Sequence, residues 1–564
     1  MTVPRLRTLG YTYKHIKRYR DIVIVLVKHG FGDFITSINL PGHVDLSRKL
    51  LRRQPGVKIG TYSRWERVRL ALEELGPTFV KAGQIMSNRP DMLPQKLIVE
   101  LEKLQDLVPP FPTVEARQMI EEELGAPIPS LFREFTDIPV ASASIAQVHK
   151  AVLLSGEEVV IKVQRPGIKQ LIEIDVEIMI HMASLMEEHL HGMNIINPVG
   201  IIREFERSIK KEIDFTVEAM HISRFSRHFQ EDPTIYVPKV YRDLTTRKIL
   251  TMEFVNGIKI SNVNALIEAD NDPKTIASRG ADLVLKQVFE NGFFHADPHA
   301  GNIMVLDNNI ICFLDFGMMG SLLSRQRECL DSIIIGIANR DVKRIVRAAL
   351  QLSGSRHVEN ADRLEYELAD LVDEYYDLPL KDINMGELLT GLFELFITYK
   401  VKFPPDMYLL VKALITIEGV GRGIDPTFDM MSRVKPFAKK LLRDHLSPRR
   451  LARDVYLSAS EFALLARDLP TEIRDIIEQI KLGEIKIEFE HMGLEPVLQK
   501  GDQVSNRIAL SIVLAALTVG SALIVLSKTP PMWKGVPLVG VIGFIGAGIM
   551  CFWLLISILR HGRM

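Results

Sequence analysis

Residues 293–317, which read FFHADPHAGNIMVLDNNIICFLDFG, hold the polar side chains best suited to chemistry. Asn302 follows Asp297 by five positions, and Asp315 follows Asn302 by thirteen. Phosphoryl transfer needs a carboxylate beside the proton of the nucleophile, and Mg²⁺ needs hard oxygen ligands. We therefore expect Asp297 to act as the base or to orient the substrate, and Asn302 and Asp315 to hold magnesium. Two short apolar runs between these ligands, at 303–306 and 310–314, predict a hairpin that fixes them on rigid backbone. Each residue alone is ordinary in a turn, so the prediction depends on their joint spacing.

Lys162 is the second residue whose surroundings indicate phosphate chemistry. It lies in the β-branched run VVIKV at 159–163, where a buried lysine needs an anionic partner. A strand-edge lysine that faces solvent is the plainer alternative. A lysine in a strand, then H-x-D-x-x-x-x-N, then D-F-G is the motif order of protein kinases. That order predicts that the Lys162 ammonium binds the α- and β-phosphates of a nucleotide.

The acidic partner of Lys162 is expected on the helical stretch between the two motifs, which the pattern predicts from Gly200 to about Phe229. Residues 210–220, KKEIDFTVEAM, offer the three acids Glu212, Asp214 and Glu218. Glu218 is the first choice for the ion pair and Glu212 the second. Any one of the three acids also fits a solvated helix face.

The glycine-rich loop that precedes the lysine in kinases is missing from this chain. The small residues that take its place are Ala141, Ser142, Ala143 and Ser144. Small side chains still allow the backbone to approach phosphate, but their Cβ atoms restrict the positive-φ conformations that glycine supplies. We therefore expect a nucleotide site of a different shape. Further along, the run 249–255 corresponds to the kinase hinge, where backbone groups of Glu253 and Val255 would hydrogen-bond adenine.

Two regions of different pattern must position these residues. Short β-branched runs broken by turn residues extend from 130 to 255 and predict a small antiparallel sheet. Helical patterns dominate residues 61–129 before it and residues 256–500 after it. The expected fold class is α+β, a protein-kinase-like two-lobe fold. In it, residues 130–255 form the N-lobe, residues 256–500 the C-lobe and residues 61–129 a helical N-terminal extension.

Residues 501–564 predict a transmembrane helical hairpin. Two uncharged runs, at about 508–527 and 536–559, are long enough to cross a bilayer as helices, and the prolines between them are unlikely to continue a helix. Two buried helices of a soluble core are the alternative. Three cations flank the runs and two lie in the loop, which favours cytoplasmic ends. The glycines that allow close packing, within the hairpin or in a homodimer, are Gly540, Gly543, Gly546 and Gly548.

Residues 1–60 form a basic amphipathic, membrane-proximal segment, which is the second candidate for contact with the membrane. The first twenty carry six cations and no acid, with tyrosines between them. Such a segment could lie on anionic lipid, or it could be a solvated basic helix packed on the next domain. The apolar run that follows is short and lacks a small-residue cleavage site, so a signal peptide is not expected.

Composition limits the function classes further. Lys+Arg and Asp+Glu both number 70, so the formal net charge is 0 and a wholly basic, nucleic-acid-binding surface is excluded. No nucleic-acid partner is expected. Three cysteines cannot form a disulfide framework or a Cys-rich zinc site. Apolar residues at 47% and charged residues at 25% are ordinary for a folded chain.

Over roughly residues 60 to 500 the chain resembles the UbiB family of atypical kinase-like proteins. The motifs that carry the resemblance are K-x-G-Q (Lys81, Gln84), the alanine-rich loop (141–144), E-x-D (Glu212, Asp214) and H-x-D-x-H-x-G-N (His295, Asp297, His299, Gly301, Asn302). One departure is visible, because the alanine-rich loop reads A-S-A-S instead of an unbroken alanine run. That departure bears on nucleotide selectivity.

The resemblance implies a membrane-bound ATPase or kinase of ubiquinone (prenyl-quinone) biosynthesis, with ATP or ADP and Mg²⁺ as cofactors. It implies that the N-terminal extension covers the site where ordinary kinases bind protein substrates. Lys81 and Gln84 would then reach toward the nucleotide, and Glu212 or Asp214 would meet Lys81. The partners that it implies are membrane lipids, prenyl-quinone precursors and quinone-biosynthesis enzymes. The expected location is the bacterial inner membrane, with the kinase-like domain facing the cytoplasm.

Two other functions fit part of the pattern. Small-molecule kinases of the aminoglycoside or choline kinase type share H-x-D-x-x-x-x-N, but they lack the K-x-G-Q extension and the anchor. A non-catalytic nucleotide-binding scaffold of a quinone-biosynthesis complex would be favoured by loss of the site residues. Lys162, Asp297, Asn302 and Asp315 are all present.

Overall fold

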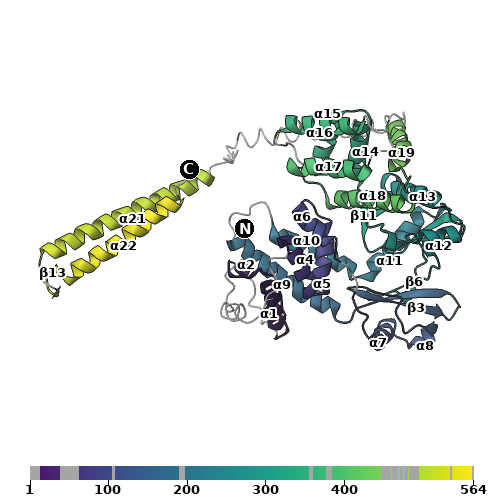
Figure 1. Ribbon diagram of the computed structural model, residues 1–564, viewed down its shortest axis with the longest axis horizontal. Coiled ribbons are helices and arrows are strands. Elements are labelled where there is room, and N and C mark those ends of the chain that lie inside the picture. The colour runs from purple at the N-terminus through teal and green to yellow at the C-terminus, as the bar shows by residue number, and fades with distance from the viewer. Residues whose placement is uncertain are drawn as a thin grey trace. The chain divides into compact units, whose positions relative to one another are not determined.

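A five-stranded antiparallel sheet forms the small lobe of the computed structural model (Figure 1). The strand order is β1-β3-β4-β6, with β2 beside β3. The bounds are β1 Phe132–Phe135, β2 Ala141–Ser142, β3 Ala146–Leu153, β4 Glu158–Gln164 and β6 Ile249–Glu253. On β4, Val159, Ile161 and Val163 are buried in an apolar cluster. Because strand side chains alternate, Lys162 projects from the opposite face.

The structure describes residues 13–37, 62–104, 108–189, 197–354, 358, 360–376, 384–445, 495–533 and 536–561, with six single positions between 459 and 481. Parts of two predicted regions, at 1–12, 38–61 and most of 446–494, lie outside the described residues. The chain divides into two units, Met1–Ala452 and Arg453–Met564, and each is described by itself.

Helices precede the sheet and follow it. Before the sheet lie α1 Tyr13–Lys28, α2 Gly32–Ser37, α4 Arg64–Leu75, α5 Pro77–Ser87, α6 Gln95–Leu101, α7 Thr113–Leu124 and α8 Ile128–Leu131. Between β4 and β6 lie α9 Ile168–His189, α10 Pro198–Glu212, α11 Phe215–His228, β5 Ile235–Tyr236 and η2 Arg242–Leu244. The helical extension and the small antiparallel sheet therefore agree with the sequence prediction.

The large lobe is mainly helical. Its helices are α12 Val263–Glu268, α13 Pro273–Lys286, η3 Gln287–Asn291, α14 Ser324–Ala338, α15 Val342–Ser353, α16 Ala361–Tyr376, α17 Met385–Thr398, α18 Pro405–Ile424 and α19 Met430–His445. One continuous apolar core runs through this lobe and reaches α5, α9, α10 and α11. Its fully buried phenylalanines include Phe205, Phe215, Phe225, Phe294 and Phe316.

Short strands carry the motif at 293–317. β8 Phe293–His295 pairs with β11 Met319–Ser321, and β9 Ile303–Leu306 pairs with β10 Ile310–Phe313, both antiparallel. β9 also pairs with β7 Ile258–Lys259, and β10 with β5. The 3-10 turns η4 Ala300–Asn302 and η5 Asp307–Asn309 connect them. The predicted strand pair is confirmed, and it fixes Asn302 and Asp315 at its two ends.

The helical stretch predicted from Gly200 to about Phe229 is broken in the structure. α10 ends at Glu212, and α11 begins at Phe215 after Asp214. The Asp214 backbone is extended, and its side-chain carboxylate caps α11 by accepting a hydrogen bond from the Thr216 N–H. An aspartate at the N-cap satisfies an otherwise unpaired donor of the first turn. The break places Glu212 and Glu218 on two different helices.

The N-terminal helix α1 packs on the body of its unit. Ile22 is 1% exposed, and the Arg18 guanidinium donates to both oxygens of buried Asp175 on α9, at 2.6 and 2.9 Å. Arg18 also donates to the Leu75 carbonyl at the end of α4, at 2.8 Å. The structure therefore shows Tyr13–Lys28 as a helix packed on its unit, and contact of this segment with anionic lipid stays a prediction.

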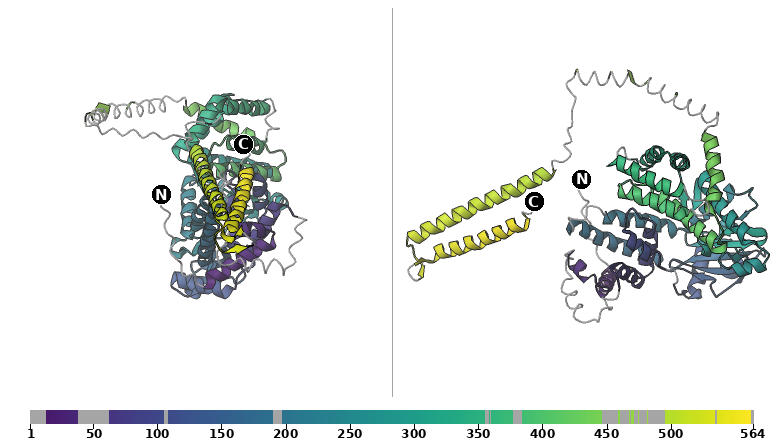
Figure 2. Two further views of the ribbon diagram at one scale, coloured as in Figure 1. Left: turned by 90° about the vertical axis from the view of Figure 1, so that its left-hand side faces the viewer. Right: turned by 45° about the horizontal axis from the view of Figure 1, so that its top comes forward.

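The second unit contains a helical hairpin. α21 Glu495–Leu526 and α22 Leu538–His561 run side by side (Figure 2), joined by the short strands β12 Met532–Trp533 and β13 Val536–Pro537. Ser505–Leu526 is long and apolar enough to cross a membrane. In α22 the apolar stretch found among the described residues, Leu538–Trp553, is shorter than a full span. Both helices of the predicted hairpin are therefore present, and one of them meets the criteria for a membrane span.

The glycines of α22 divide into two groups. A Cβ on Gly540 would lie 2.6 Å from Val525 Cγ2 and 3.1 Å from the Ser521 carbonyl oxygen, and Gly543 also lies against Ser521. A Cβ on Gly546 or Gly548 would meet nothing within 4 Å. The first two glycines therefore allow the close approach of α21 and α22, as predicted for packing within the hairpin.

Candidate functional site

A buried ion pair joins Lys162 to Glu218. Lys162 Nζ on β4 lies 2.8 Å from Glu218 Oε2 on α11, and the two side chains are 18% and 6% exposed. This is the pairing preferred from the sequence. Burial opposes the charge on Lys162, but the carboxylates of Glu218 and Asp315 outweigh it and raise the pKa of Lys162. The ammonium is therefore charged at neutral pH and lies near Asp315.

Burial also raises the pKa of Glu218, and the neighbouring carboxylate of Asp315 acts in the same direction. Lys162 and its hydrogen bond oppose this shift. A carboxylate so placed keeps its charge only because the ammonium lies beside it. The pair is therefore a single electrostatic unit that holds α11 against the lysine strand.

A second lysine–acid pair lies in the same region. Lys81 on α5 forms an ion pair with Glu212 at the end of α10. Glu212 acts electrostatically on Lys162, and Lys81 acts on Asp315. The K-x-G-Q lysine of the N-terminal extension therefore reaches the charged cluster around Asp315. Of the two acids that the family resemblance offered for Lys81, the structure selects Glu212.

Asp315 follows strand β10 and is open to solvent. Its Oδ1 accepts the Gly317 N–H at 2.8 Å. Partial loss of surrounding water is the largest single effect and raises the pKa of Asp315. The Lys162 ammonium, the Gly317 N–H and the neighbouring His295 and Lys81 together outweigh it and lower this pKa to about 2. The carboxylate is therefore ionised at neutral pH, as a magnesium ligand must be.

The catalytic-loop residues are held by β8 and its partner strand. His295 is 1% exposed, and its Nδ1 accepts the Asp297 N–H at 3.2 Å. Burial lowers the pKa of His295, so that the ring is neutral and can accept this bond. Asn302 is fixed through its backbone, because its N–H donates to the His299 carbonyl at 2.9 Å and its carbonyl accepts the Leu314 N–H at 3.0 Å. The backbone thus positions Asp297 and Asn302 on one rigid loop.

The small-residue loop is tied to Arg165, which follows directly after the strand that carries Lys162. Arg165 Nη2 donates to the carbonyls of Pro109 and Ala143, at 3.0 and 3.3 Å. Ala141 and Ser142 pair with β3. Ser144 is fully buried, and its hydroxyl has no hydrogen-bond partner within the part of the chain that the structure describes. A buried hydroxyl without a partner fits a loop that is completed by a ligand.

The residues present fit a nucleotide with magnesium. Among the described residues, no group of three or more His, Cys, Asp or Glu side chains is arranged for a metal ion. Mg²⁺ is often held by one or two protein oxygens together with substrate phosphates and waters. Asn302 and Asp315, at the two ends of the β9–β10 hairpin, supply such a pair, and Lys162 supplies a phosphate partner.

Three predicted site residues make contacts of a different kind from those expected. The Gln84 amide donates to the Leu104 carbonyl at 3.2 Å, so it secures the extension and does not reach toward the lysine cluster. Asp214 caps α11 and lies 3.5 Å from Arg247, so it is not the partner of Lys81. The Glu253 N–H donates to the Lys239 carbonyl at 2.9 Å, which removes this donor from the expected adenine contact.

These contacts do not test the other expected adenine contacts, those of the Glu253 carbonyl and of Val255. The Glu253 carboxylate accepts the Tyr236 hydroxyl at 2.6 Å and the Lys239 N–H at 3.1 Å, so the side chain stabilises the β6 end. Val255 is buried just beyond the strand. Adenine contacts by the Glu253 carbonyl and by Val255 stay predictions.

The sequence reasoning missed Lys412 on α18. Its Nζ lies 3.4 Å from Asp297 Oδ1, and both side chains are 32% exposed. Lys412 also acts electrostatically on Glu102, at the end of α6, whose pKa is raised by burial. The signal that could have found it is a single lysine in the middle of the apolar run YLLVKALITI at 408–417.

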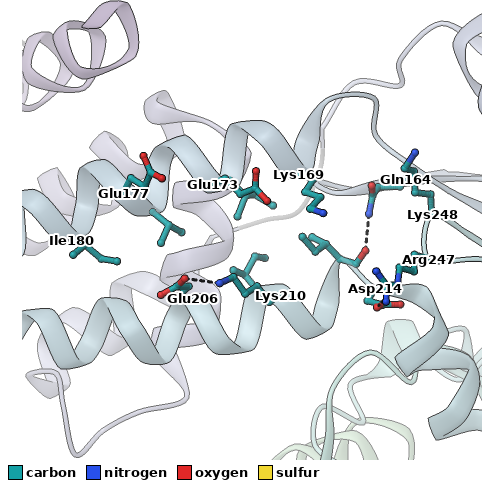
Figure 3. Close-up of a pocket in the computed structure, with 14 residues that line it drawn as sticks. Gln164, Lys169, Glu173, Glu177, Ile180, Glu206, Lys210, Asp214, Arg247 and Lys248 are labelled. Atoms are coloured by element: carbon teal, nitrogen blue, oxygen red, sulfur yellow. Dashed lines mark hydrogen bonds and ion pairs between the residues drawn. The ribbon is translucent and has the colours of Figure 1, made fainter. Parts of the chain in front are cut away.

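A pocket of about 530 Å³ lies between α9 and α10 (Figure 3). Its floor is apolar, and its rim carries charged side chains such as the Glu206–Lys210 pair, 2.6 Å apart. Of the predicted site residues only Asp214 lines it. Gln164 connects this pocket to the lysine strand, because its amide donates to the Ile213 carbonyl at 2.6 Å. The pocket is therefore distinct from the cluster around Asp315.

Comparisons with known families agree with this arrangement. Residues 103–349 match the ABC1 atypical kinase-like domain, residues 368–429 the UbiB helical domain, and residues 492–560 the ABC1/UbiB kinase-like C-terminal domain.

Similar proteins are known from several bacteria. An "Uncharacterized protein in hydrogenase 1 5'region" of Clostridium pasteurianum is 32% identical, over 97% of this chain and 100% of that protein. A "Probable protein kinase UbiB" of Marinobacter nauticus is 36% identical, over 74% of this chain and 77% of that protein. A protein of the same name from Pseudomonas putida is 33% identical, over 91% of this chain and 94% of that protein.

A solved structure is also similar, titled "The complex structure of Rv3197-erythromycin from Mycobacterium tuberculosis". The match has 20% sequence identity and a TM-score of 0.46, and it covers 64% of this chain and 93% of that chain.

Proposed function

The chain belongs to the UbiB family of ABC1 atypical kinase-like proteins, and we propose that it is a membrane-anchored ATPase that binds ATP with Mg²⁺ and supports ubiquinone biosynthesis. Its fold is kinase-like and α+β, and its family has a role in ubiquinone biosynthesis. One observation carries the proposal of ATP chemistry: the charged Lys162 lies near the ionised Asp315, beside a second lysine–acid pair.

The chain's own residues suit phosphoryl transfer from a nucleoside triphosphate. Bound Mg–ATP would supply the transferable phosphoryl group, held by Lys162, Asn302 and Asp315. Asp297 orients the acceptor, which is water in an ATPase, and takes its proton. The acceptor oxygen forms a bond to the terminal phosphorus, the bond from phosphorus to the diphosphate oxygen breaks, and the electron pair leaves with the diphosphate.

The N-terminal extension supports an ATPase more than an ordinary protein kinase. Lys81 of α5 reaches the Asp315 cluster through its ion pair with Glu212. The extension helix that carries Lys81 therefore contacts the charged cluster of the site. We therefore infer that water, or a small lipid head group, is the acceptor.

The hairpin of the second unit supports membrane anchoring. Ser505–Leu526 has the length and composition of a span. Polyprenyl tails of quinone precursors partition into the bilayer core, whereas their head groups need polar chemistry at its surface. An anchored ATPase in the bacterial inner membrane, with its kinase-like unit in the cytoplasm, could extract or present these precursors to quinone-biosynthesis enzymes. A homodimer through the open glycines of α22 is part of the same proposal.

The test compares ATP hydrolysis by the full chain in liposomes with that of Asp315→Asn. We expect magnesium-dependent turnover in the wild type and a loss of about a hundredfold or more in the variant, because one metal ligand is removed. Unchanged turnover would rule out the assigned metal site.

Complementation of a quinone-deficient strain separates an enzyme from a scaffold. Wild type should restore quinone synthesis and Asp297→Asn should not. Rescue by both would favour the scaffold.

A further inference from the structure

We propose that Lys412 binds the terminal phosphate of the nucleotide and thereby distinguishes a triphosphate from a diphosphate. This inference rests on the proposed ATP chemistry and assigns to it a residue outside the kinase motifs. Lys412 lies in α18, 115 positions after Asp297. Its ammonium reaches the carboxylate that would orient the acceptor, with Nζ 3.4 Å from Asp297 Oδ1.

The packing of α18 on its neighbouring elements fixes the position of Lys412. α18 packs on α13 and on β11, the strand that pairs with β8 before Asp297. At the start of α18, Asp406 accepts the Ser321 N–H of β11 at 3.3 Å. Neighbours of Lys412 in the helix, among them Leu410, Ala413 and Leu414, are buried in the core. A side chain on such a rigid element can hold a charge at a defined place.

The contact of Lys412 with Asp297 leaves donor capacity. A charge-assisted N–H···O bond is normally about 2.7–2.9 Å long, and the separation here is 3.4 Å. An ammonium has three donors, and the Lys412 side chain is 32% exposed. It can therefore accept a second anionic partner without leaving the neighbourhood of Asp297.

The carboxylates that interact with Lys412 are Asp297 and, electrostatically, Glu102 at the end of α6. A phosphate is the further anion that the proposed function brings to this end of the site. Lys162 and Lys81 each have a carboxylate in direct contact, Glu218 and Glu212 respectively. Lys412 is the cation beside Asp297, at the acceptor end of the site. Negative charge on the terminal phosphoryl oxygens would lie at this end, where a fixed cation stabilises the transition state.

The α- and β-phosphates are assigned to Lys162, so removal of Lys412 should affect ATP and not ADP. The experiment measures the binding of Mg–ATP and Mg–ADP to the full chain in nanodiscs by calorimetry, together with turnover. The variants are Lys412→Met, which removes the charge, and Lys412→Arg, which keeps it. Lys402→Met is the matched control, because Lys402 is an exposed lysine just before α18.

Lys412→Met should weaken ATP binding about tenfold and leave ADP binding within about twofold, because one charge-assisted contact is lost. Turnover should fall about a hundredfold. Lys412→Arg should retain most of the ATP preference, and Lys402→Met should behave as the wild type. Retained ADP binding shows that the variant is folded.

Equal effects on ATP and ADP, or none on either, would overturn the assignment of Lys412 while the proposed ATPase stands. A role limited to holding Asp297 would lower turnover and leave the preference for ATP over ADP unchanged, which also overturns it. A wild-type chain that binds neither nucleotide would remove both the proposed function and this inference.

Discussion

The buried ion pair between Lys162 and Glu218 gives the sharpest prediction for stability. Removal of one member of a buried pair typically costs about 3–5 kcal/mol, because the remaining charge is left without its partner. Glu218→Gln leaves Lys162 beside Asp315, so we expect a cost near the lower end, about 3 kcal/mol. Lys162→Met leaves Glu218 and Asp315 facing each other, so we expect about 5 kcal/mol.

The double variant Lys162→Met/Glu218→Gln tests whether the two charges act as one unit. With both charges of the pair removed, the cost should be smaller than that of Lys162→Met alone and well below the sum of the two single costs. At about 2 °C per kcal/mol for a large domain, the melting temperature should fall by about 6 °C for Glu218→Gln and about 10 °C for Lys162→Met.

The assay is thermal unfolding of the nucleotide-free full chain in detergent. Lys210→Met serves as the control, because Lys210 forms an exposed pair with Glu206 at 2.6 Å. Such a pair is worth about 0.3–0.5 kcal/mol, so the melting temperature should move by about 1 °C. A double variant that melts lower than either single variant, by the sum of their shifts, would refute the coupling of Lys162 with Glu218.

Three further outcomes follow from the structure. The folded-state pKa of Asp315, about 2, lies below its ordinary value of 3.8. Its ionised form therefore stabilises the fold above pH 3.8, and this contribution is lost as the pH falls toward 2. The stability difference between wild type and Asp315→Asn, measured by unfolding at several pH values, should shrink over that window, and a difference independent of pH would contradict the shift. Arg18→Met leaves buried Asp175 without its partner. It should therefore cost about 3–5 kcal/mol and speed proteolysis within α1, and unchanged cleavage would argue against the packed helix. Gly540→Val should separate α21 from α22, seen as a longer spin-label distance, because its Cβ would meet Val525 and the Ser521 backbone. Gly546→Val is the control, and equal distances in the two variants would contradict the proposed packing.

Local sequence patterns predict those parts of the site whose residues lie close together in the sequence. The β-branched run around Lys162 and the hairpin between Asn302 and Asp315 were readable because strand periodicity and turn residues are properties of neighbouring positions. The preferred pairing of Lys162 with Glu218 is confirmed by their ion pair.

Contacts that depend on tertiary structure were not readable. Residues 200–229 are helical throughout by pattern, and the break at Asp214 appears only because this residue caps α11. Lys412 lies 115 positions from Asp297, so no motif spacing connects them. The Glu253 N–H cannot donate to adenine, because in the folded protein it donates to the Lys239 carbonyl beside β6.

The most direct test of the account is whether ATP binding by the full chain in nanodiscs depends on magnesium through Asp315. The wild type should bind ATP at least tenfold more tightly with Mg²⁺ than without it, and Asp315→Asn should lose this difference. ATP binding that is equally tight with and without Mg²⁺ in the wild type, or an undiminished magnesium effect in Asp315→Asn, would contradict the convergence of Lys162, Asn302 and Asp315 on a nucleotide.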